Sequence, residues 1–437
     1  MQQLRLNRKL AFDHYIGGPL AWLLNISACL IAKVIRRDHS LSRPPRAVLF
    51  IKFIGLGSVV RGSFLVTAVR AKYPDAKIYF ASFPAVSPLV SMFDDVDEVK
   101  VVRDDTIPHL LVDTLELLFW CWRKRIDLVI DLELHAKYSA IVSVLSMARD
   151  RAGFAGISSR FRRGLYTHLV FWNPVRYIGK AYRQLAEALA LPDSSEAPIS
   201  IPPSAQAEAV QRLQTLGWTS EMRIIGINPN ASDLRAERKW PERYFAALID
   251  MLPPDQKFMV VVFGSRDEWQ VAENVRTKVT STQYPIHNIA GTVSFAALCE
   301  ILKRLSLFVT NDSGPMHVAR AFNTPTVSLW GPTHPVNYCP PGGRHIAVYR
   351  PVYCSPCTHA TDVPPCGGDN QCLQRIEPAR VLRAVCTLLK ISLPHTTLTF
   401  YEAPHEPSVL GYWRPHSVPL PGSSSKGWAG RCSKNSS

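Results

Sequence analysis

The sequence predicts an α/β protein built from two doubly wound domains. Residues 47–54 (AVLFIKFI) form a continuous apolar run, which a parallel strand needs when helices cover both faces of its sheet. Strand-like and helix-like segments then alternate, and the alternation starts again near residue 222. Between the two series lies PDSSEAPISIPPSAQ, which has no strand pattern. We therefore expect two domains of similar size, with the carboxyl ends of both sheets around one central cleft.

The first domain is expected to span residues 46–192. Its first strand ends in a glycine turn, and a helix follows to about Tyr73. Apolar and β-branched residues predict further strands at 77–82, 98–102 and 127–133. Helices are expected near Ser87, from Ile107 to Arg125, and up to about Leu191.

The second domain is expected to span residues 221–392, after a linker and domain start at 193–220. Apolar runs predict its strands at 222–229, 257–264, 287–291, 307–312 and 324–331. Helices are expected after Pro241, through Glu273, over 294–304 and from Gly314. Pro, Ser, Gly and His then dominate without periodicity, so we interpret residues 393–437 as a mobile tail.

Residues 1–45 are expected to associate with a membrane. They carry seven Lys and Arg against two acids, and no charge falls between Tyr15 and Ala32. From Pro19 the pattern is helical and places Asn25, Lys33 and Arg36 within about 80° of one another on an otherwise apolar surface. We interpret this segment as an amphipathic helix lying in the plane of an anionic membrane. A helix packed on the protein body and a membrane-spanning helix remain the alternatives.

The composition limits the class of protein and the class of partner. Hydrophobic residues make up 47% and charged residues 19%, which excludes a disordered chain. The formal charge of +15 favours anionic partners. No zinc-finger or recognition-helix pattern accompanies the basic patches, so nucleic acid is not an expected partner. Ten cysteines without a cleavable signal favour a reducing cytosol.

The first candidate binding segment is FIGLGSVVRG, residues 53–62. Here Gly55 and Gly57 make a turn after a buried strand, and a helix is expected to start near Ser58. Backbone N–H groups at such a turn point at its occupant, and an anion suits them. The segment lacks G-x-G-x-x-G, which argues against a dinucleotide. A purely structural tight turn remains the alternative.

The second segment is VTNDSGPMHVARA, residues 309–321. Asp312, Ser313 and Gly314 close a strand and open a helix, whose positive N-terminal end would attract a diphosphate. His317 falls on the same face one turn later. An ordinary N-cap role for Asp312 or Ser313 is the alternative.

The third segment is NPNASDLRAERKWPERYFAAL, residues 228–248. It places Arg235, Arg238 and Lys239 after a strand, with Trp240 and Pro241 at the start of the next helix. Fixed cations at a strand end would neutralise the charge on a departing phosphate. A solvated basic loop is the alternative.

Together these segments resemble glycosyltransferase family 9, the heptosyltransferases of lipopolysaccharide assembly, over roughly residues 46–389. The resemblance implies the GT-B fold. It rests on four elements: D-[ST]-G-x-x-H (Asp312, Ser313, Gly314, His317), the following GPT (Gly331, Pro332, Thr333), basic-x-W-P (Arg238, Trp240, Pro241) and the strand end VIDLELHAKYSA at 129–140.

The resemblance implies an inverting transfer of a sugar, heptose, from a nucleoside diphosphate donor such as ADP-heptose, with no other cofactor. Arg238 would meet the charge of the leaving diphosphate, and Glu268 would reach a ribose hydroxyl. No metal site is expected, because cations and a helix N-terminus would hold that charge and no D-x-D element lies in this half of the chain. The implied donor-binding residues are Asn230, Ser232, Lys239, Glu268, Asp312, Ser313, Gly314 and His317.

One position departs from the family pattern. The family usually has an Asp just after the second glycine of the first turn, as the proposed general base, and this chain has Ser58. A serine hydroxyl cannot accept the acceptor's proton near neutral pH as a carboxylate does. Asp131 and Glu133 end the fourth strand on one face, about 7 Å apart, and Glu133 is the expected substitute base. A solvent-facing acid paired with Lys137 or an arginine is the alternative for Glu133.

For the whole chain, the alternative is a non-catalytic protein that binds a nucleotide sugar or a glycan. For an enzyme, we expect a phosphorylated or lipid-linked glycan acceptor at the inner, cytoplasmic face of the bacterial plasma membrane. The basic residues Arg149, Arg151, Arg160, Arg162 and Arg163 would face its phosphates, although a merely solvated surface fits them equally.

Four cysteines lie within nineteen residues: Cys354, Cys357, Cys366 and Cys372. The C-x-x-C half suits zinc, while the second pair is spaced more loosely. A structural metal, a disulfide in an exposed loop and free thiols therefore all remain open.

Overall fold

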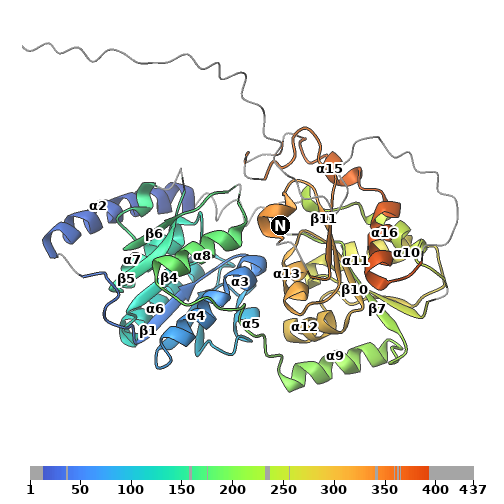
Figure 1. Cartoon of the computed structure of the whole chain (residues 1–437), viewed down its shortest axis with the longest axis horizontal. Coiled ribbons are helices and arrows are strands. Elements are labelled where there is room, and N and C mark those ends of the chain that lie inside the picture. Colours follow the sequence, from blue (N-terminus) through green and yellow to red (C-terminus); the bar gives the residue numbers. More distant parts are fainter. Residues whose placement is uncertain are drawn as a thin grey trace, which may run out of the picture. The chain divides into compact units, whose positions relative to one another are not determined.

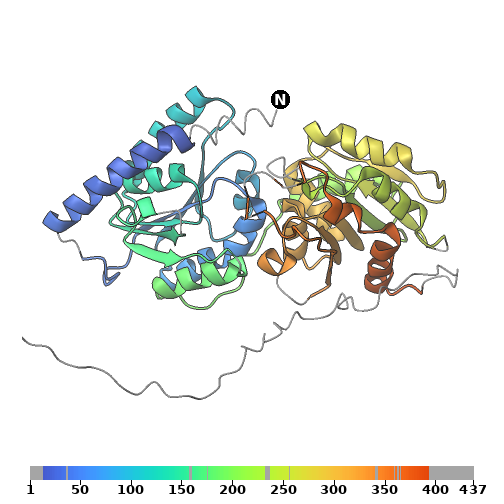
Figure 2. The same ribbon diagram turned by 90° about the horizontal axis from the view of Figure 1, so that it is seen from above.

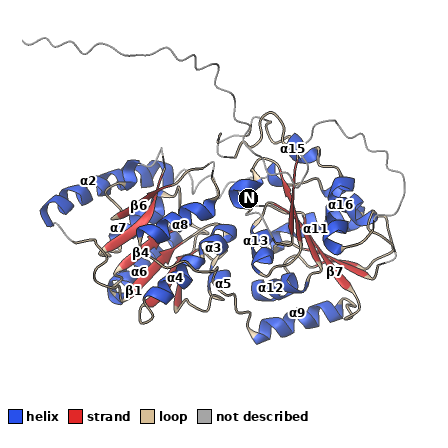
Figure 3. Ribbon diagram, in the orientation of Figure 1, coloured by secondary structure: helices blue, strands red, loops and turns tan. Residues whose placement is uncertain are grey.

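In the described part of the chain, the strands form two six-stranded sheets, one in each half (Figures 1 and 3). The computed structural model describes residues 13–35, 38–156, 160–174, 176–231, 237–254, 256–339, 343–358, 360–361, 364 and 366–392. The predicted mobile tail at 393–437 lies outside this part. Neighbouring strands are parallel throughout both sheets. The predicted α/β class with two doubly wound sheets is confirmed.

The N-terminal sheet has the order β3-β2-β1-β4-β5-β6. Every side chain of β1 is buried, as its apolar run requires. Val48 and Phe50 join the core on one face, and Leu49 and Ile51 join the core on the other. The strands are β1 (Ala47–Ile51), β2 (Lys77–Ser82), β3 (Glu98–Val101), β4 (Leu128–Asp131), β5 (Asp150–Ala155) and β6 (His168–Phe171).

Helices cover both faces of this sheet. α3, α4, α5 and α8 pack on the side of Val48 and Phe50, while α6 and α7 pack on the side of Leu49 and Ile51. The helices are α3 (Leu56–Gly62), α4 (Phe64–Lys72), α5 (Ser87–Val90), α6 (Ile107–Lys124), α7 (Lys137–Leu145), the 3₁₀ turn η2 (Arg160–Arg162) and α8 (Ile178–Ala188).

The C-terminal sheet repeats this arrangement in the order β12-β11-β10-β7-β8-β9. Its strands are β7 (Arg223–Asn228), β8 (Phe258–Val262), β9 (Ile286–Asn288), β10 (Leu307–Asn311), β11 (Thr326–Trp330) and β12 (His345–Tyr349). The helices of this half are α9 (Pro203–Thr215), α10 (Glu242–Asp250), η4 (Arg266–Glu268), α11 (Trp269–Lys278), α12 (Phe295–Arg304), α13 (Gly314–Ala321), α14 (Pro335–Tyr338), α15 (Gln371–Gln374) and α16 (Pro378–Leu389).

The predicted strands are all present, but β5, β6 and β12 were not expected. β5 begins Asp150-Arg151 and contains Gly153, so its sequence lacks the apolar run by which the others were found. β12 is an edge strand with mostly half-buried side chains. Helix α9 starts inside the segment predicted as a linker, and it buries Ala209 and Leu213.

The N-terminal helix α2 (Gly18–Ile35) follows a short π-helical turn, η1 (Asp13–Gly17), and packs on α7 (Figure 2). Ala21 of this helix is fully buried, and Asn25 Oδ1 accepts a hydrogen bond of 2.6 Å from the Gly164 amide. Asn25, predicted to share a polar strip with Lys33 and Arg36, therefore faces the protein, because a backbone amide there needs an acceptor. Residues 13–32 are long and apolar enough to span a bilayer, with a mean hydropathy of 1.5.

Candidate donor site

The glycine turn after β1 begins with Gly55, whose φ of 95° suits glycine. Its carbonyl accepts hydrogen bonds from the amides of Ser58 (3.0 Å) and Val59 (3.1 Å), so α3 starts at Leu56, slightly earlier than predicted. Those two amides therefore already donate within the first turn of the helix. The amides of Leu56 and Gly57 precede them and have no carbonyl of the helix as an acceptor.

Gly57 lies directly against His317, which comes from the other sheet domain. A Cβ on Gly57 would lie 2.3 Å from His317 Cδ2 and 2.7 Å from its Nε2. Gly314 is similarly close to Leu56, with 3.0 Å between its would-be Cβ and Leu56 Cδ1. The glycines thus allow the start of α3 and the start of α13 to touch, and this contact brings the first and second predicted segments together.

The start of α13 is left open for a ligand. Ser313 makes no capping hydrogen bond, so the N-cap alternative is wrong for this residue. Its hydroxyl instead accepts from Asn228 Nδ2 at 3.1 Å and lies 3.0 Å from Thr310 Oγ1. These bonds turn the serine back onto the sheet. The first amides of α13, with the positive end of the helix dipole, remain available to an anion.

The basic loop of the third segment is fixed by Trp240. Its backbone amide donates to Asn311 Oδ1 at 3.0 Å and its indole Nε1 donates to the Ile376 carbonyl at 2.9 Å. The anchored loop places Arg238 Nε 3.5 Å from Asp312 Oδ2, with both side chains mostly buried. Arg238 is therefore not part of a solvated loop. Lys239 is half-buried, and Ser232 and Arg235 lie outside the described residues.

Positive charges of three arginines act on the His317 ring at this junction. Burial, and then the charges of Arg61, Arg320, His345 and Arg238, hold the pKa of His317 well below its usual value, so the ring is neutral at pH 7. Arg61 and Arg320 were not predicted as site residues. The available signal was their spacing: Arg61 follows Gly57 by one turn of α3, and Arg320 follows His317 by three residues on α13.

Several buried polar atoms here have no hydrogen-bond partner in the described structure: Asn230 Oδ1, Arg238 Nε, Asp312 Oδ2 and His317 Nδ1. Arg238 Nε and Asp312 Oδ2 face each other as an ion pair at 3.5 Å, but Asn230 Oδ1 and His317 Nδ1 have no such partner. Buried polar atoms normally have hydrogen-bond partners, so these exceptions point to a polar ligand. Glu268 lies nearby, since a Cβ on Gly264 would be 2.9 Å from Asn230 Nδ2 and 3.1 Å from Glu268 Cβ. One Glu268 oxygen accepts from the Ser265 amide in a capping box.

The two carboxylates at the end of β4 lie in the interior. Glu133 Oε2 pairs with Lys52 Nζ at 2.7 Å, and Oε1 accepts from the amides of Phe53 (2.9 Å) and Ile54 (3.1 Å). It is thus neither solvent-facing nor paired with Lys137. Asp131 is fully buried and accepts from the Glu133 amide and the Tyr166 hydroxyl; burial raises its pKa, against the charge of Arg162.

His135 follows these carboxylates and is more accessible to a substrate. Its ring packs edge-on against Trp172 with centroids 4.7 Å apart, while part of the residue stays exposed. The surrounding protein atoms, then the charges of Arg162 and Lys52, lower its pKa, and Glu133 partly offsets them. The ring is therefore a free base at pH 7. The sequence signal was its place in the quoted strand-end motif, although no role was assigned to it.

A family model described as glycosyltransferase family 9 (heptosyltransferase) matches residues 122–366 of the 437. The chain belongs to this family. It is a glycosyltransferase, and the non-catalytic alternative is not favoured. Lipooligosaccharide heptosyltransferase 2 of Haemophilus influenzae is 26% identical over 321 residues, which cover 69% of this chain and 88% of that protein. Lipopolysaccharide heptosyltransferase 2 of Escherichia coli K12 is 27% identical over 346 residues, covering 76% and 96%.

Solved structures agree on the fold. Escherichia coli ADP-heptose lipopolysaccharide heptosyltransferase II aligns over 79% of this chain and 98% of its own, with a TM-score of 0.64 and 23% identity. A family 9 glycosyltransferase from Veillonella parvula aligns over 79% and 97%, with a TM-score of 0.67 and 22% identity. The family 9 chain thus has the expected GT-B fold of two doubly wound domains.

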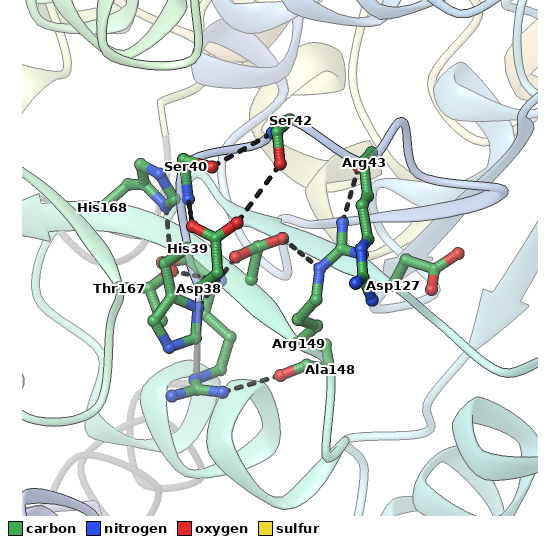
Figure 4. A network of polar contacts seen from close by, with 12 residues as sticks. Asp38, His39, Ser40, Ser42, Arg43, Asp127, Ala148, Arg149, Thr167 and His168 are labelled. Carbon is green, nitrogen blue, oxygen red and sulfur yellow. Dashed lines mark hydrogen bonds and ion pairs between the residues drawn. The ribbon is translucent and has the colours of Figure 1, made fainter. Parts of the chain in front are cut away.

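The predicted acceptor arginines of this glycosyltransferase mostly bind the protein itself. Arg162 is fully buried and donates to the carbonyls of Glu133, Phe154 and Ala136, so its predicted phosphate-facing position is wrong. Arg149 belongs to a network at the amino end of β5, where it bonds Asp150 and the Arg43 carbonyl (Figure 4).

Arg151 likewise donates to the carbonyls of Ala148 and Leu165. Arg163 is exposed, and the Arg160 side chain lies outside the described part. Among the described arginines of this group, Arg163 is the exposed one, Arg149 and Arg151 are half-buried, and Arg162 is buried.

The four clustered cysteines of the family 9 chain surround one pocket, with Tyr353 and Asn370 beside them. All four are free thiols, so the disulfide alternative is not what the structure has. Within the described residues, no three His, Cys, Asp or Glu side chains are grouped as metal ligands.

Replacing Gly57 with alanine should weaken nucleotide binding. The new Cβ would overlap the His317 ring and force α3 and α13 apart, and overpacking of this kind costs about 1–3 kcal/mol. We expect the ADP affinity, measured by isothermal titration, to fall about ten- to a hundredfold. Gly62→Ala in the same helix is the control, since its Cβ would approach no atom closer than 3.3 Å. Equal losses in both variants would count against the close-contact explanation.

Proposed function

We propose that this family 9 glycosyltransferase moves a heptose from ADP-heptose to a lipopolysaccharide-type glycan at the inner face of the bacterial plasma membrane. The observation that carries the proposal is the group of buried polar atoms without hydrogen-bond partners, Asn230 Oδ1 and His317 Nδ1 beside the Arg238–Asp312 ion pair, at the start of α13. Support for the sugar and the acceptor comes from the relatives, which are named as lipopolysaccharide or lipooligosaccharide heptosyltransferases. A solved neighbour is named for ADP-heptose.

The donor diphosphate would lie between Arg61, Arg238, Arg320 and the amides that open α13. Their positive charge is fixed before the ligand arrives, so it can stabilise the negative charge that develops on the departing phosphate without reorganisation. We therefore propose that these cations do the work that a metal ion does in other transferases. The neutral His317 would add a hydrogen bond through its unpartnered Nδ1.

Asp312 is better suited to hydroxyl groups than to phosphates. A carboxylate repels a diphosphate, but it accepts strongly from sugar hydroxyls and it holds Arg238 by charge at 3.5 Å. We propose that Asp312 orients Arg238 and accepts from the donor's sugar. Glu268 and Asn230, at the ends of neighbouring strands β8 and β7, would recognise the ribose. Ser232 and Lys239 stay proposed donor contacts.

Removing Arg238 should weaken ADP binding about ten- to a hundredfold. A hydrogen bond to a charged group contributes about 1.5–3 kcal/mol, and each 1.4 kcal/mol is tenfold in affinity. Asp312→Ala should lose somewhat less, because Arg238 remains but is no longer held. Isothermal titration measures both, with Arg243→Ala as the control: that arginine is exposed and stacks over Tyr244. If both site variants bind ADP with unchanged affinity, the proposed donor site is wrong.

The general base is proposed at the end of β4. The sequence favoured Glu133, but both of its oxygens are already occupied: one accepts from the Lys52 ammonium and the other from the amides of Phe53 and Ile54. We propose that Glu133 positions the turn through Phe53 and Ile54, while His135 takes the acceptor's proton. Asp131, fully buried, would support both through the backbone and Tyr166.

His135→Asn should cut kcat by about 10²- to 10⁴-fold, the usual contribution of a positioned base, and leave ADP affinity unchanged. His109→Asn, an exposed histidine paired with Asp105, is the control. Glu133→Gln should disturb KM and kcat together, because it loosens the turn. If Glu133→Gln alone removes turnover while His135→Asn keeps it, the base is Glu133, as the sequence predicted.

The pH profile of kcat tests the same assignment. Lys52 and Arg162 help to lower the pKa of His135 below its usual value of about 6.5, so the ring is deprotonated throughout the neutral range. Turnover should stay level from about pH 8 to 6.5 and decrease only at lower pH, as the ring gains a proton. Lys52→Met removes one of the lowering charges and should move this acid limb to higher pH. An unmoved limb would contradict the assignment.

A further inference from the structure

Helix α6 has an apolar face that nothing in the described structure covers. Leu115 is 69% exposed, Phe119 is 64% exposed and Trp122 is 52% exposed. Ile107, Leu111 and Val112 are also exposed, and these residues recur every three or four positions along one side of the helix. A surface helix normally carries polar residues there, and a contiguous apolar patch indicates an interaction site.

The opposite side of α6 is an ordinary core side. Leu117, Leu118 and Cys121 are buried against the sheet with Leu49. Between the two sides, Asp113 pairs with Arg103 at 2.7 Å and Glu116 pairs with Lys100 at 3.2 Å. The inner side of α6 therefore already packs in the core of its own domain. The apolar residues on the outer side take no part in that packing.

Helix α2 presents a second apolar face on the same side of the N-terminal sheet. Both α2 and α6 pack against α7. Trp122 Nε1 donates to the Leu145 carbonyl at 2.9 Å at the end of α7, and Met147 beside it is 67% exposed. The exposed apolar residues of α2 and its preceding turn are Tyr15, Ile16, Leu20, Trp22, Leu23, Ile26, Leu30, Ile31 and Val34.

Polar contacts hold α2 along the domain. The Asp13 carboxylate accepts from the amides of Lys137 (3.2 Å) and Tyr138 (2.8 Å) at the start of α7, and Asn25 accepts from Gly164. After the helix, His39 Nδ1 lies 2.9 Å from Asp150 Oδ1 in the network of Figure 4. A helix tied at its start, middle and end would have to break these bonds to cross a bilayer.

We propose that the outer faces of α2 and α6 form one surface that lies flat on a bilayer containing anionic lipid. This goes beyond the proposed function, in which α6 takes no part. Exposed aromatic side chains suit the boundary between headgroups and acyl chains, and they are Tyr15 in η1, Trp22 on α2, and Phe119 and Trp122 on α6.

Basic residues at the helix ends make a membrane the fitting occupant. The exposed Arg123 and Arg125 lie at the end of α6, and residues 1–45 carry seven Lys and Arg against two acids. Cations at the rim of an apolar face attract anionic headgroups. Pairing two copies through this face would instead bring like charges together, in a chain that already carries +15.

Sedimentation of the full chain with vesicles tests the proposal, using phosphatidylcholine alone and with about a third phosphatidylglycerol. We expect binding to the anionic vesicles. Leu115→Glu with Phe119→Glu on α6, and separately Trp22→Glu with Leu23→Glu on α2, should each lower partitioning at least tenfold, because each pair replaces two apolar side chains with carboxylates that anionic headgroups repel. Tyr353→Glu is the control, because this residue of the other domain is 95% exposed.

Leu115→Gln with Phe119→Gln is the milder companion variant, and an unchanged thermal shift with ADP shows that each variant is folded. Loss of vesicle binding with retained ADP binding supports the surface, whatever the fate of the proposed heptose transfer. Wild-type partitioning of the α6 variants overturns it. It is also overturned if α6 substitution only dissociates a dimer in sedimentation velocity, or if the chain resists alkaline carbonate extraction, as a spanning helix does.

Discussion

The contact between Gly57 and the His317 ring is the constraint on which the donor site depends. Two helices, one from each sheet domain, start at this point, and each has a glycine where the other approaches. A side chain at either position would separate them. Their positive ends, with Arg61 from one helix and Arg320 from the other, then act on the same small volume. The positive groups therefore come together only because the two glycines let the helices approach.

Carboxylates already lie beside two of these arginines. Arg61 pairs with Glu196 and Arg238 lies 3.5 Å from Asp312, whereas Asn230 Oδ1 and His317 Nδ1 have no hydrogen-bond partner in the described structure. His317 responds by staying neutral. The unused hydrogen-bonding atoms lie beside these cations, where a polar, anionic ligand would meet both.

The N-terminal domain uses its charges differently. Lys52 and Glu133 form an ion pair beneath the glycine turn, and Arg162 donates hydrogen bonds to three carbonyls. These buried groups give the turn a fixed shape, because leaving any of them unpaired would cost several kcal/mol, of order 3–5. The same domain leaves large apolar side chains such as Phe119 in solvent. The N-terminal domain therefore has buried charged groups next to the glycine turn and exposed apolar side chains on α6.

The sequence alone determined the two series of strands and the donor motif from Asp312 to His317, because apolar runs and a strand-to-helix turn are local properties of the chain. Tertiary structure alone decided three matters. It turned Asn25 inward to the Gly164 amide, it buried Arg162, and it brought Arg61 to His317. A sequence gives the charge of a residue, but which carbonyl, amide or cation meets that charge depends on how other segments fold around it, from 8 residues away for Arg162 and Phe154 to 139 for Asn25 and Gly164.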